Sequence, residues 1–150
     1  MNKSYSNELL EEIKTRFPEV SIEVYAPRRT YLLVPWATAY EISKFFFFEK
    51  KMRLSTATGI DTRDGIEIIY HFSHDESGTY YSIRALVPKD SLKIRSLTDF
   101  LPAANWIERE IHELLGVDFT GHPNLAPLLT SDDWPKDAYP LRRDYPKESK

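Results

Sequence analysis

Cysteine is absent from this chain of 150 residues, and glycine is scarce, with five residues that do not cluster. Without thiols the chain cannot form disulfides, hold an iron–sulfur cluster through thiolates, or use cysteine as a nucleophile. Without clustered glycines it has no phosphate-binding loop, and it also lacks the G-x-S-x-G pattern of a serine nucleophile. We therefore expect no catalytic residue, no bound cofactor and no metal site within the chain.

Long apolar runs and an excess of positive charge are also missing. The longest purely apolar run covers residues 45–48, whereas a membrane-spanning helix needs roughly 20 apolar residues. Residues 1–17 contain no unbroken apolar segment of the kind found in signal peptides. The formal net charge of −3 argues against a nucleic-acid partner. We expect a protein that is soluble, or that is held at a membrane only through partner proteins.

The first hundred residues have the pattern of an α+β core domain, 1–100. Apolar residues at helical spacing predict a helix over 8–17 that ends before Pro18, and a second helix follows Pro35 over 36–51. Runs rich in β-branched and aromatic residues predict five strands, at 20–26, 30–35, 53–60, 66–72 and 79–88. The economical packing is a mostly antiparallel mixed sheet of about five strands with helices on one face.

Residues 101–150 have a different character. A helix is predicted over 102–115, with Pro102 in its first turn and Gly116 at its end. The residues that follow carry half of the ten prolines together with many large apolar side chains. Proline prevents a continuing helix, and disordered segments are poor in large apolar groups. We predict an extended C-terminal tail that lies along the surface of a partner protein.

The predicted helix 102–115 separates into two sides. At 100° per residue Trp106 falls on the apolar side, with the alanines, isoleucines and leucines, and Glu108, Arg109, His112 and Glu113 fall on the polar side. Glu110 projects into the apolar side, where an unpaired carboxylate is costly. We expect Glu110 to pair with Arg84, Arg142 or Arg143. The alternative is that a small rotation of the helix brings Glu110 to solvent.

Residues 112–116, HELLG, partly match the helix of zinc peptidases. That helix needs histidines four residues apart, and the second position is occupied here by Gly116. A Glu-x-x-His pair would need a carboxylate at position 109, which is an arginine. The remaining histidines, at 71, 74 and 122, have no ligand-like spacing. The sequence therefore favours a solvated or interface pair of Glu108 and His112 over a metal site.

From Pro102 onward the sequence resembles the 30 kDa (C-type) subunit family of NADH-quinone oxidoreductase, or complex I. The family pattern has a helix of the form A-x-W-x-E-R-E with a terminal glycine, then G-H-P-x-L, a tryptophan turn and P-L-R-K/R-D-Y/F-P. These elements occur in order in PAANWIEREIHELLG, GHPNL, DDWP and YPLRRDYP, through the following residues: Trp106, Glu108, Arg109, Glu110, Gly116, His122, Pro123, Trp134, Leu141, Arg142 and Arg143. The first hundred residues match more weakly.

The resemblance implies a non-catalytic structural subunit of the hydrophilic arm. Such a protein carries no cofactor and lies on the cytoplasmic side of the membrane, where it clamps the catalytic large subunit beside an iron–sulfur small subunit. Iron–sulfur clusters, and a [NiFe] site or a quinone and flavin, would belong to those partners. Burial against the partner is expected for Trp134, Tyr139, Leu141 and Tyr145, and charge-assisted hydrogen bonds for Arg142 and Arg143.

The same family also serves membrane-bound energy-converting [NiFe] hydrogenases. The short chain, with nothing appended after RRDYPKESK, and the long Asp-Asp-Trp-Pro turn favour the hydrogenase type over the respiratory type. Two other classes stay open: a stand-alone enzyme with an unrecognised site, and a free binding module or assembly factor.

Overall fold

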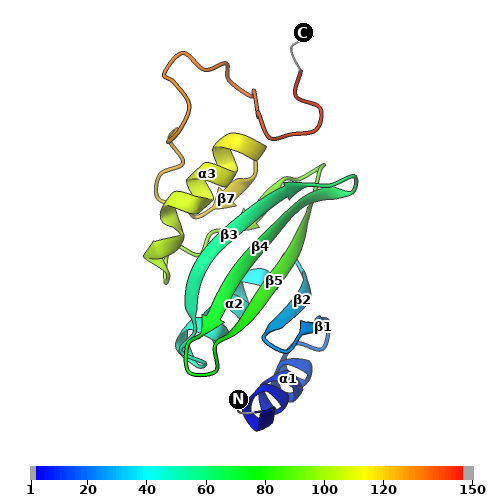
Figure 1. Cartoon of the computed structure of the whole chain (residues 1–150). Helices are drawn as coiled ribbons and strands as arrows, with labels where there is room; N and C mark the ends of the chain where they lie inside the picture. The colour runs from blue at the N-terminus through cyan, green and yellow to red at the C-terminus, as the bar shows by residue number, and fades with distance from the viewer. Residues whose placement is uncertain (1–2, 147–150) are drawn as a thin grey trace.

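The computed structural model describes residues 3–146, and it folds as a five-stranded mixed sheet with three helices on one face (Figure 1). The elements follow the predicted order, with two short strands that the sequence pattern did not predict, β6 and β7. In chain order they are α1 (Lys3–Arg16), β1 (Ser21–Ala26), β2 (Arg29–Pro35), α2 (Ala39–Phe48), β3 (Arg53–Asp61), β4 (Gly65–His74), β5 (Thr79–Pro88), β6 (Lys93–Arg95), the 3-10 turn η1 (Pro102–Ala104), α3 (Asn105–Leu115) and β7 (Asp118–Thr120).

The strand order across the sheet is β1-β2-β5-β4-β3. Three of the four neighbouring pairs are antiparallel, and β2 with β5 is parallel. The parallel pair arises because α2 crosses over the sheet after β2 and the hairpin β3–β4 then brings β5 back beside β2. The predicted α+β fold with a mostly antiparallel sheet is confirmed.

One face of the sheet carries the core. Strand residues alternate between the two faces, and on the covered face the fully buried large side chains include Leu32, Ile68, Tyr70, Phe72, Tyr81 and Ile83. Phe46 of α2 lies edge-on to Phe72 and Tyr81, with ring centroids 5.7 and 5.9 Å apart. Phe17, after α1, packs on Phe45 in the same way at 5.7 Å.

The third helix, α3, lies on the covered face at the edge strand β3 (Figure 1). Gly59 of β3 allows this approach, because a Cβ atom there would lie only 2.5 Å from the Leu115 side chain. The position needs a residue without a side chain, so that the end of α3 can rest on the strand.

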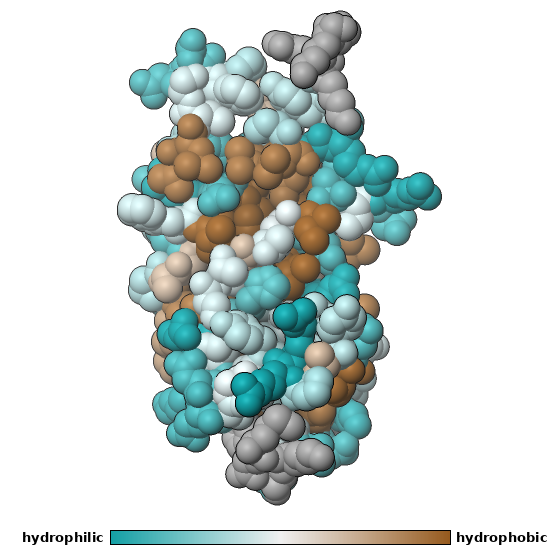
Figure 2. Space-filling view, viewed as in Figure 1, coloured by the Kyte–Doolittle hydropathy of each residue, from teal (hydrophilic) through white to brown (hydrophobic). Residues whose placement is uncertain are grey.

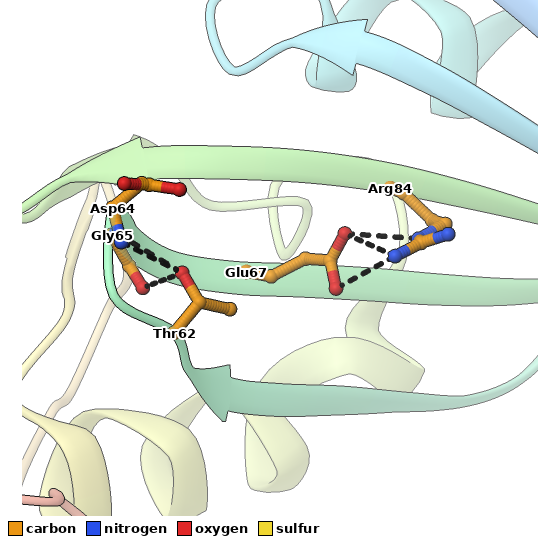
Figure 3. A network of polar contacts seen from close by, with 5 residues as sticks. All are labelled: Thr62, Asp64, Gly65, Glu67 and Arg84. Atoms are coloured by element: carbon orange, nitrogen blue, oxygen red, sulfur yellow. Dashed lines mark hydrogen bonds and ion pairs between the residues drawn. The ribbon is translucent and has the colours of Figure 1, made fainter.

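The opposite face of the sheet is open and more polar. Arg84 of β5 donates from Nε and Nη2 to the two carboxylate oxygens of Glu67 on β4, at 2.9 and 3.1 Å (Figure 3). At the nearby β3–β4 turn, the N–H groups of Asp64 and Gly65 donate to the Thr62 hydroxyl. Arg84 is therefore engaged on the face away from α3, and it is not the partner expected for Glu110.

Strands β6 and β7 join the two parts of the chain that the sequence separated at residue 100. They pair in parallel, with Ile94 beside Phe119, and both of these side chains are buried. Each strand has only three residues, too few to show a strand pattern in the sequence. The last four residues of the predicted tail, 147–150, lie outside the described part of the chain.

Candidate partner interface

Helix α3 is turned about its axis relative to the sequence prediction. Its buried residues are Glu108, Ile111 and Leu115, which follow one another at the three- and four-residue spacing of a single helix face. Trp106, predicted on the apolar side, is 71% exposed, and Glu108, predicted on the polar side, is 0% exposed. The prediction failed because it placed apolar residues on the buried face and charged residues on the exposed face. Glu108 and Trp106 are exceptions to that rule.

Glu108 is held inside the core by three donors. Its carboxylate accepts the Ser96 hydroxyl at 2.6 Å and the Leu97 N–H at 2.9 Å, and the Tyr70 hydroxyl lies at 3.5 Å. Burial raises the pKa of Glu108 to about 7, although these donors favour the charged form. Glu108 thereby ties α3 to the segment after β6 and to the sheet.

The predicted pair of Glu108 and His112 does not form. His112 lies 2.8 Å through Nδ1 from the Val117 carbonyl oxygen, just beyond the end of the helix. His74, at the end of β4, is buried, with its Nδ1 2.9 Å from the Ser77 hydroxyl. Within residues 3–146 no three histidine, aspartate or glutamate side chains gather as metal ligands would.

Beyond its first turn, the tail, residues 121–146, is attached to α3 at two further places, and the first uses charged side chains of the helix. Arg109 donates to the carbonyl oxygens of Ala126 and Pro127, at 3.0 and 2.9 Å. One turn later, Glu113 accepts the backbone N–H groups of Leu128, Leu129 and Thr130 at 2.8–3.0 Å, together with the Thr130 hydroxyl. An arginine and a glutamate thus satisfy consecutive carbonyl and N–H groups of an extended segment that has no strand partner.

Glu113 is strongly stabilised as an anion. Burial alone would raise its pKa, but the Thr130 hydroxyl and the three N–H donors outweigh burial and lower the pKa to about 2. A carboxylate that accepts several N–H groups favours its charged form strongly. The first attachment therefore depends on the ionised state of Glu113.

His122 and Pro123 shape the start of the tail. The Asn124 N–H donates to His122 Nδ1 at 3.0 Å, which leaves Nε2 to donate to the Asn105 carbonyl oxygen at 3.1 Å. Pro123, between them, is exposed. The imidazole thus fastens the turn after β7 to the beginning of α3.

The second attachment lies at the end of α3, over Gly116. Gly116 adopts a left-handed conformation with φ 73°, and a Cβ atom there would lie 2.4 Å from the Arg142 guanidinium and 2.7 Å from the Tyr139 ring. The Arg142 Nε donates to the Leu115 carbonyl oxygen at 2.7 Å, and its guanidinium stacks on Tyr139 at 4.2 Å. The glycine both ends the helix and leaves room for the tail.

Two further contacts hold this second part of the tail. The Leu141 N–H donates to the Leu114 carbonyl oxygen at 3.1 Å, and the Arg143 N–H donates to the Asp61 carboxylate at 2.8 Å. Burial would raise the pKa of Asp61, but the Arg143 N–H and Lys89, 3.2 Å away, lower it. Arg142 is thus bonded within its own chain, whereas Arg143 uses its backbone and leaves its side chain exposed.

Between the two attachments the chain makes a loop closed by Trp134. The Trp134 Nε1–H donates to the Ala138 carbonyl oxygen at 2.8 Å, and its ring stacks on Tyr145 with centroids 6.4 Å apart. Large apolar side chains remain exposed along the tail, with Leu129 at 60%, Leu141 at 59% and Trp134 at 36%. The sequence singled out Trp134, Tyr139, Leu141 and Tyr145 for burial against a partner, and this role stays a prediction.

Glu110 has a separate position on α3. It is half-exposed, and neither Arg142 nor Arg143 bonds to it. The alternative in which a rotated helix brings Glu110 toward solvent describes its position better than the buried ion pair.

Helix α3 and the tail together form one outer surface. Charged side chains of α3 arrange the tail, and apolar groups of both face outward (Figure 2). The sequence singled out Arg109, Gly116 and Arg142 but missed Glu113 and Asp61. No pattern in the neighbouring sequence marks Glu113 or Asp61, because each accepts hydrogen bonds from a backbone segment more than ten residues away in the chain.

The family model of the respiratory-chain NADH dehydrogenase 30 kDa subunit matches residues 33–150. The match covers most of the chain, including the whole α3 and tail region. The chain belongs to this family, and it is a complex-I-like subunit of an oxidoreductase complex.

Among individual relatives, the C-type subunit of the F(420)H(2) dehydrogenase of Methanosarcina mazei is 32% identical over 142 residues, covering 91% of this chain and 89% of that protein. The C/D-type subunit of the NADH-quinone oxidoreductase of Salmonella typhimurium is 29% identical over 150 residues, and the match spans 25% of its length.

Solved structures share the fold. A chain of an archaeal membrane-bound sulfane sulfur reductase superimposes with a TM-score of 0.78 at 27% identity, covering 95% of this chain and 86% of that one. A trypsin-resistant fragment (1-134) of Nqo5 superimposes with a TM-score of 0.69 at 23% identity, covering 80% of this chain and 98% of the fragment. None of the helices formed by residues 3–146 has the length and apolar character that crossing a bilayer requires.

Proposed function

We propose that the chain is a non-catalytic structural subunit that clamps the catalytic large subunit of its oxidoreductase complex. The observation that carries this proposal is the surface formed by α3 and the tail. It exposes Trp106, Leu129 and Leu141 by more than half of their area, although the backbone that bears them is fixed by hydrogen bonds from α3. A fixed segment with exposed apolar side chains is preorganised for association, because little conformational entropy is lost on binding.

The redox groups belong to the partner subunits in this proposal. Iron–sulfur clusters, with a [NiFe] site or with a quinone and flavin, reside in the large and small subunits, and this chain holds its neighbours in position. The complex lies on the cytoplasmic side of the membrane, and this chain reaches the membrane only through other subunits. Nucleic acid is not a partner.

Two types of complex are candidates. The long Asp-Asp-Trp-Pro turn before Arg142 favours an energy-converting hydrogenase. The second candidate is a respiratory NADH-quinone oxidoreductase or a related oxidoreductase. It is favoured by the C-type subunit of F(420)H(2) dehydrogenase, which the match covers to 89% of its length.

Purification of the complex from its native host tests the proposal. With an affinity tag on this chain, we expect a large subunit and an iron–sulfur subunit to co-purify in equal amounts. Nickel in the large subunit identifies the hydrogenase type, whereas an electron-input module with flavin identifies the dehydrogenase type. Isolation of the chain alone from gently solubilised membranes and from the soluble fraction contradicts the structural role and favours a free binding module.

A further inference from the structure

A groove of about 590 Å³ lies between the edge strand β3, helix α3 and the tail. Leu54 of β3, Trp106 and Ile107 of α3, and Leu129 of the tail form its apolar walls, and Glu110 contributes a carboxylate. Figure 2 shows that apolar residues gather at the end of the molecule that carries α3, while most of the remaining surface in this view is polar. The groove therefore combines apolar area with one acidic group.

Glu110 differs from the other acidic and basic side chains of α3. Glu108 is bonded to the core, and Arg109 and Glu113 are bonded to the tail. Within residues 3–146 the Glu110 carboxylate has neither a hydrogen bond nor an ion pair with another side chain. A carboxylate on an apolar wall recognises a cation that arrives from outside, and a guanidinium can bond both of its oxygens at once.

The floor of the groove adds a backbone element. Strand β3 is the outer strand of the sheet, and a bulge between Leu54 and Thr56 interrupts its pairing with β4. Ser55 and Thr56 line the groove at this bulge, and no sixth strand of the described chain pairs with the outer edge. An edge strand offers N–H and C=O groups to an extended segment of another chain.

We propose that this groove binds an extended segment of the large subunit that places an apolar side chain between Trp106 and Leu129 and an arginine or lysine against Glu110. The inference rests on the proposed function and names the chemistry of the partner at this site. The unpaired charge of Glu110 selects a basic segment over an acidic one. The apolar walls and the strand edge select a protein segment over a free cation.

Charge reversal in the whole complex tests the assignment. The tagged chain is expressed in the native host as wild type, as Glu110→Arg, and as the control Glu76→Arg, which makes the same charge change in the exposed β4–β5 turn. We expect Glu110→Arg to retain at least roughly tenfold less large subunit after a moderate salt wash, because like charges then face each other in a poorly solvated site. Glu76→Arg retains it as the wild type does. Thermal unfolding of the purified variants checks that both chains are folded.

A crosslink identifies the occupant of the groove. The natural chain has no cysteine, so Ser55→Cys gives a single attachment point for a photoactivatable maleimide reagent. We expect the crosslinked peptide to come from the large subunit and to contain an arginine or lysine beside an apolar residue. Changing that basic residue to glutamate restores the association of Glu110→Arg.

The outcomes separate the inference from the proposed function. A wild-type chain that brings no large subunit refutes the proposed function. A wild-type chain that brings it, while Glu110→Arg performs as well as Glu76→Arg, refutes only the groove assignment. A crosslink to a second copy of this chain also overturns it, since the groove is then a contact between identical subunits.

Discussion

The sheet and the tail are stabilised in different ways. The sheet is held by continuous backbone ladders and by large side chains that α1 and α2 cover. The tail has no ladder. Some of its backbone groups form short turns within the tail, and others are bonded by side chains of α3 and β3, namely Arg109, Glu113 and Asp61. The first region depends on burial of apolar area and the second on charged groups that meet the backbone.

This difference has a consequence for function. A sheet with one covered face unfolds as a unit, whereas a segment held by a few hydrogen bonds can open locally at a lower free energy. Helix α3 links the two, because Glu108 on its buried side belongs to the core and Glu113 on its outer side belongs to the tail. The outer surface of α3 and the tail can thus change without a change in the core.

The largest effect is expected in the sheet region, for Phe46→Ala. The Phe46 ring is fully buried against Phe72 and Tyr81. Its removal leaves a cavity, and we expect a loss of about 3–5 kcal/mol in the free energy of unfolding. The matched control is Phe48→Ala two residues later, where the ring is 45% exposed. Urea unfolding of both variants should give the larger loss for Phe46→Ala, and equal losses would mean that α2 does not cover the sheet as described.

The next effect concerns the buried carboxylate that joins α3 to the core. The pKa of Glu108 is raised from 4.5 to about 7 in the folded protein, so between these values the folded state binds a proton that the unfolded state has lost. The free energy of unfolding therefore decreases as the pH rises from 4.5 to about 7, and Glu108 causes no further change above pH 7. The expected decrease is on the order of 1–3 kcal/mol.

Glu108→Gln checks this assignment, because the amide does not titrate in that range. Unfolding measured at several pH values should show a flatter dependence in the variant than in the wild type. The matched control is Glu110→Gln, the same change on the half-exposed side of α3, which should leave the wild-type slope. If Glu108→Gln keeps the full slope, another group is responsible for it.

The sheet was predictable from sequence for a physical reason. Its strands are long enough to show β-branched and aromatic enrichment, and turns such as 61–65 separate them clearly. The two three-residue strands carry no such signal. Their pairing brings residues 93–95 together with residues 118–120, across a helix, and only the tertiary structure specifies that contact.

The candidate interface was predictable only in part. The proline pattern correctly indicated an extended tail, and the glycine at 116 correctly indicated the end of the helix. The sequence could not show that the tail lies on its own helix, because an arginine that binds a backbone carbonyl can do so on any chain. Helix periodicity also misplaced Trp106 and Glu108, since it assumes that apolar residues are inside and charged residues outside.

In the tail region the strongest local change is expected for Gly116→Ala. The added Cβ atom meets Arg142 and Tyr139, and the φ of 73° is unfavourable for alanine. Gly121→Ala is the control, because its φ of 86° is equally unfavourable but nothing lies within 4 Å. Backbone strain alone should cost about 1 kcal/mol in both variants. We expect Gly116→Ala also to release residues 139–145, seen as faster amide exchange there. Equal exchange in both variants would contradict the second attachment.

The smallest effect on global stability, and the most specific, is expected for Glu113→Gln. The amide keeps one acceptor oxygen but loses the negative charge that draws together the N–H groups of residues 128–130. Because the tail can open while the sheet stays folded, we expect a loss of only about 1 kcal/mol in the free energy of global unfolding. Amide exchange at Leu128, Leu129 and Thr130 should accelerate clearly, whereas the core amides of β4 and β5 should not change.

The pH dependence of the wild type sharpens this last test. The folded-state pKa of Glu113 is lowered from 4.5 to about 2, so its contribution is complete above pH 4.5 and is lost as the pH falls toward 2. Protection of residues 128–130 should therefore decline over this window in the wild type and stay low throughout in Glu113→Gln. Glu76→Gln, on the exposed β4–β5 turn, should keep the wild-type profile. A first attachment that survives unchanged to pH 2 would show that Arg109 and the prolines hold the segment, and that the glutamate only accompanies it.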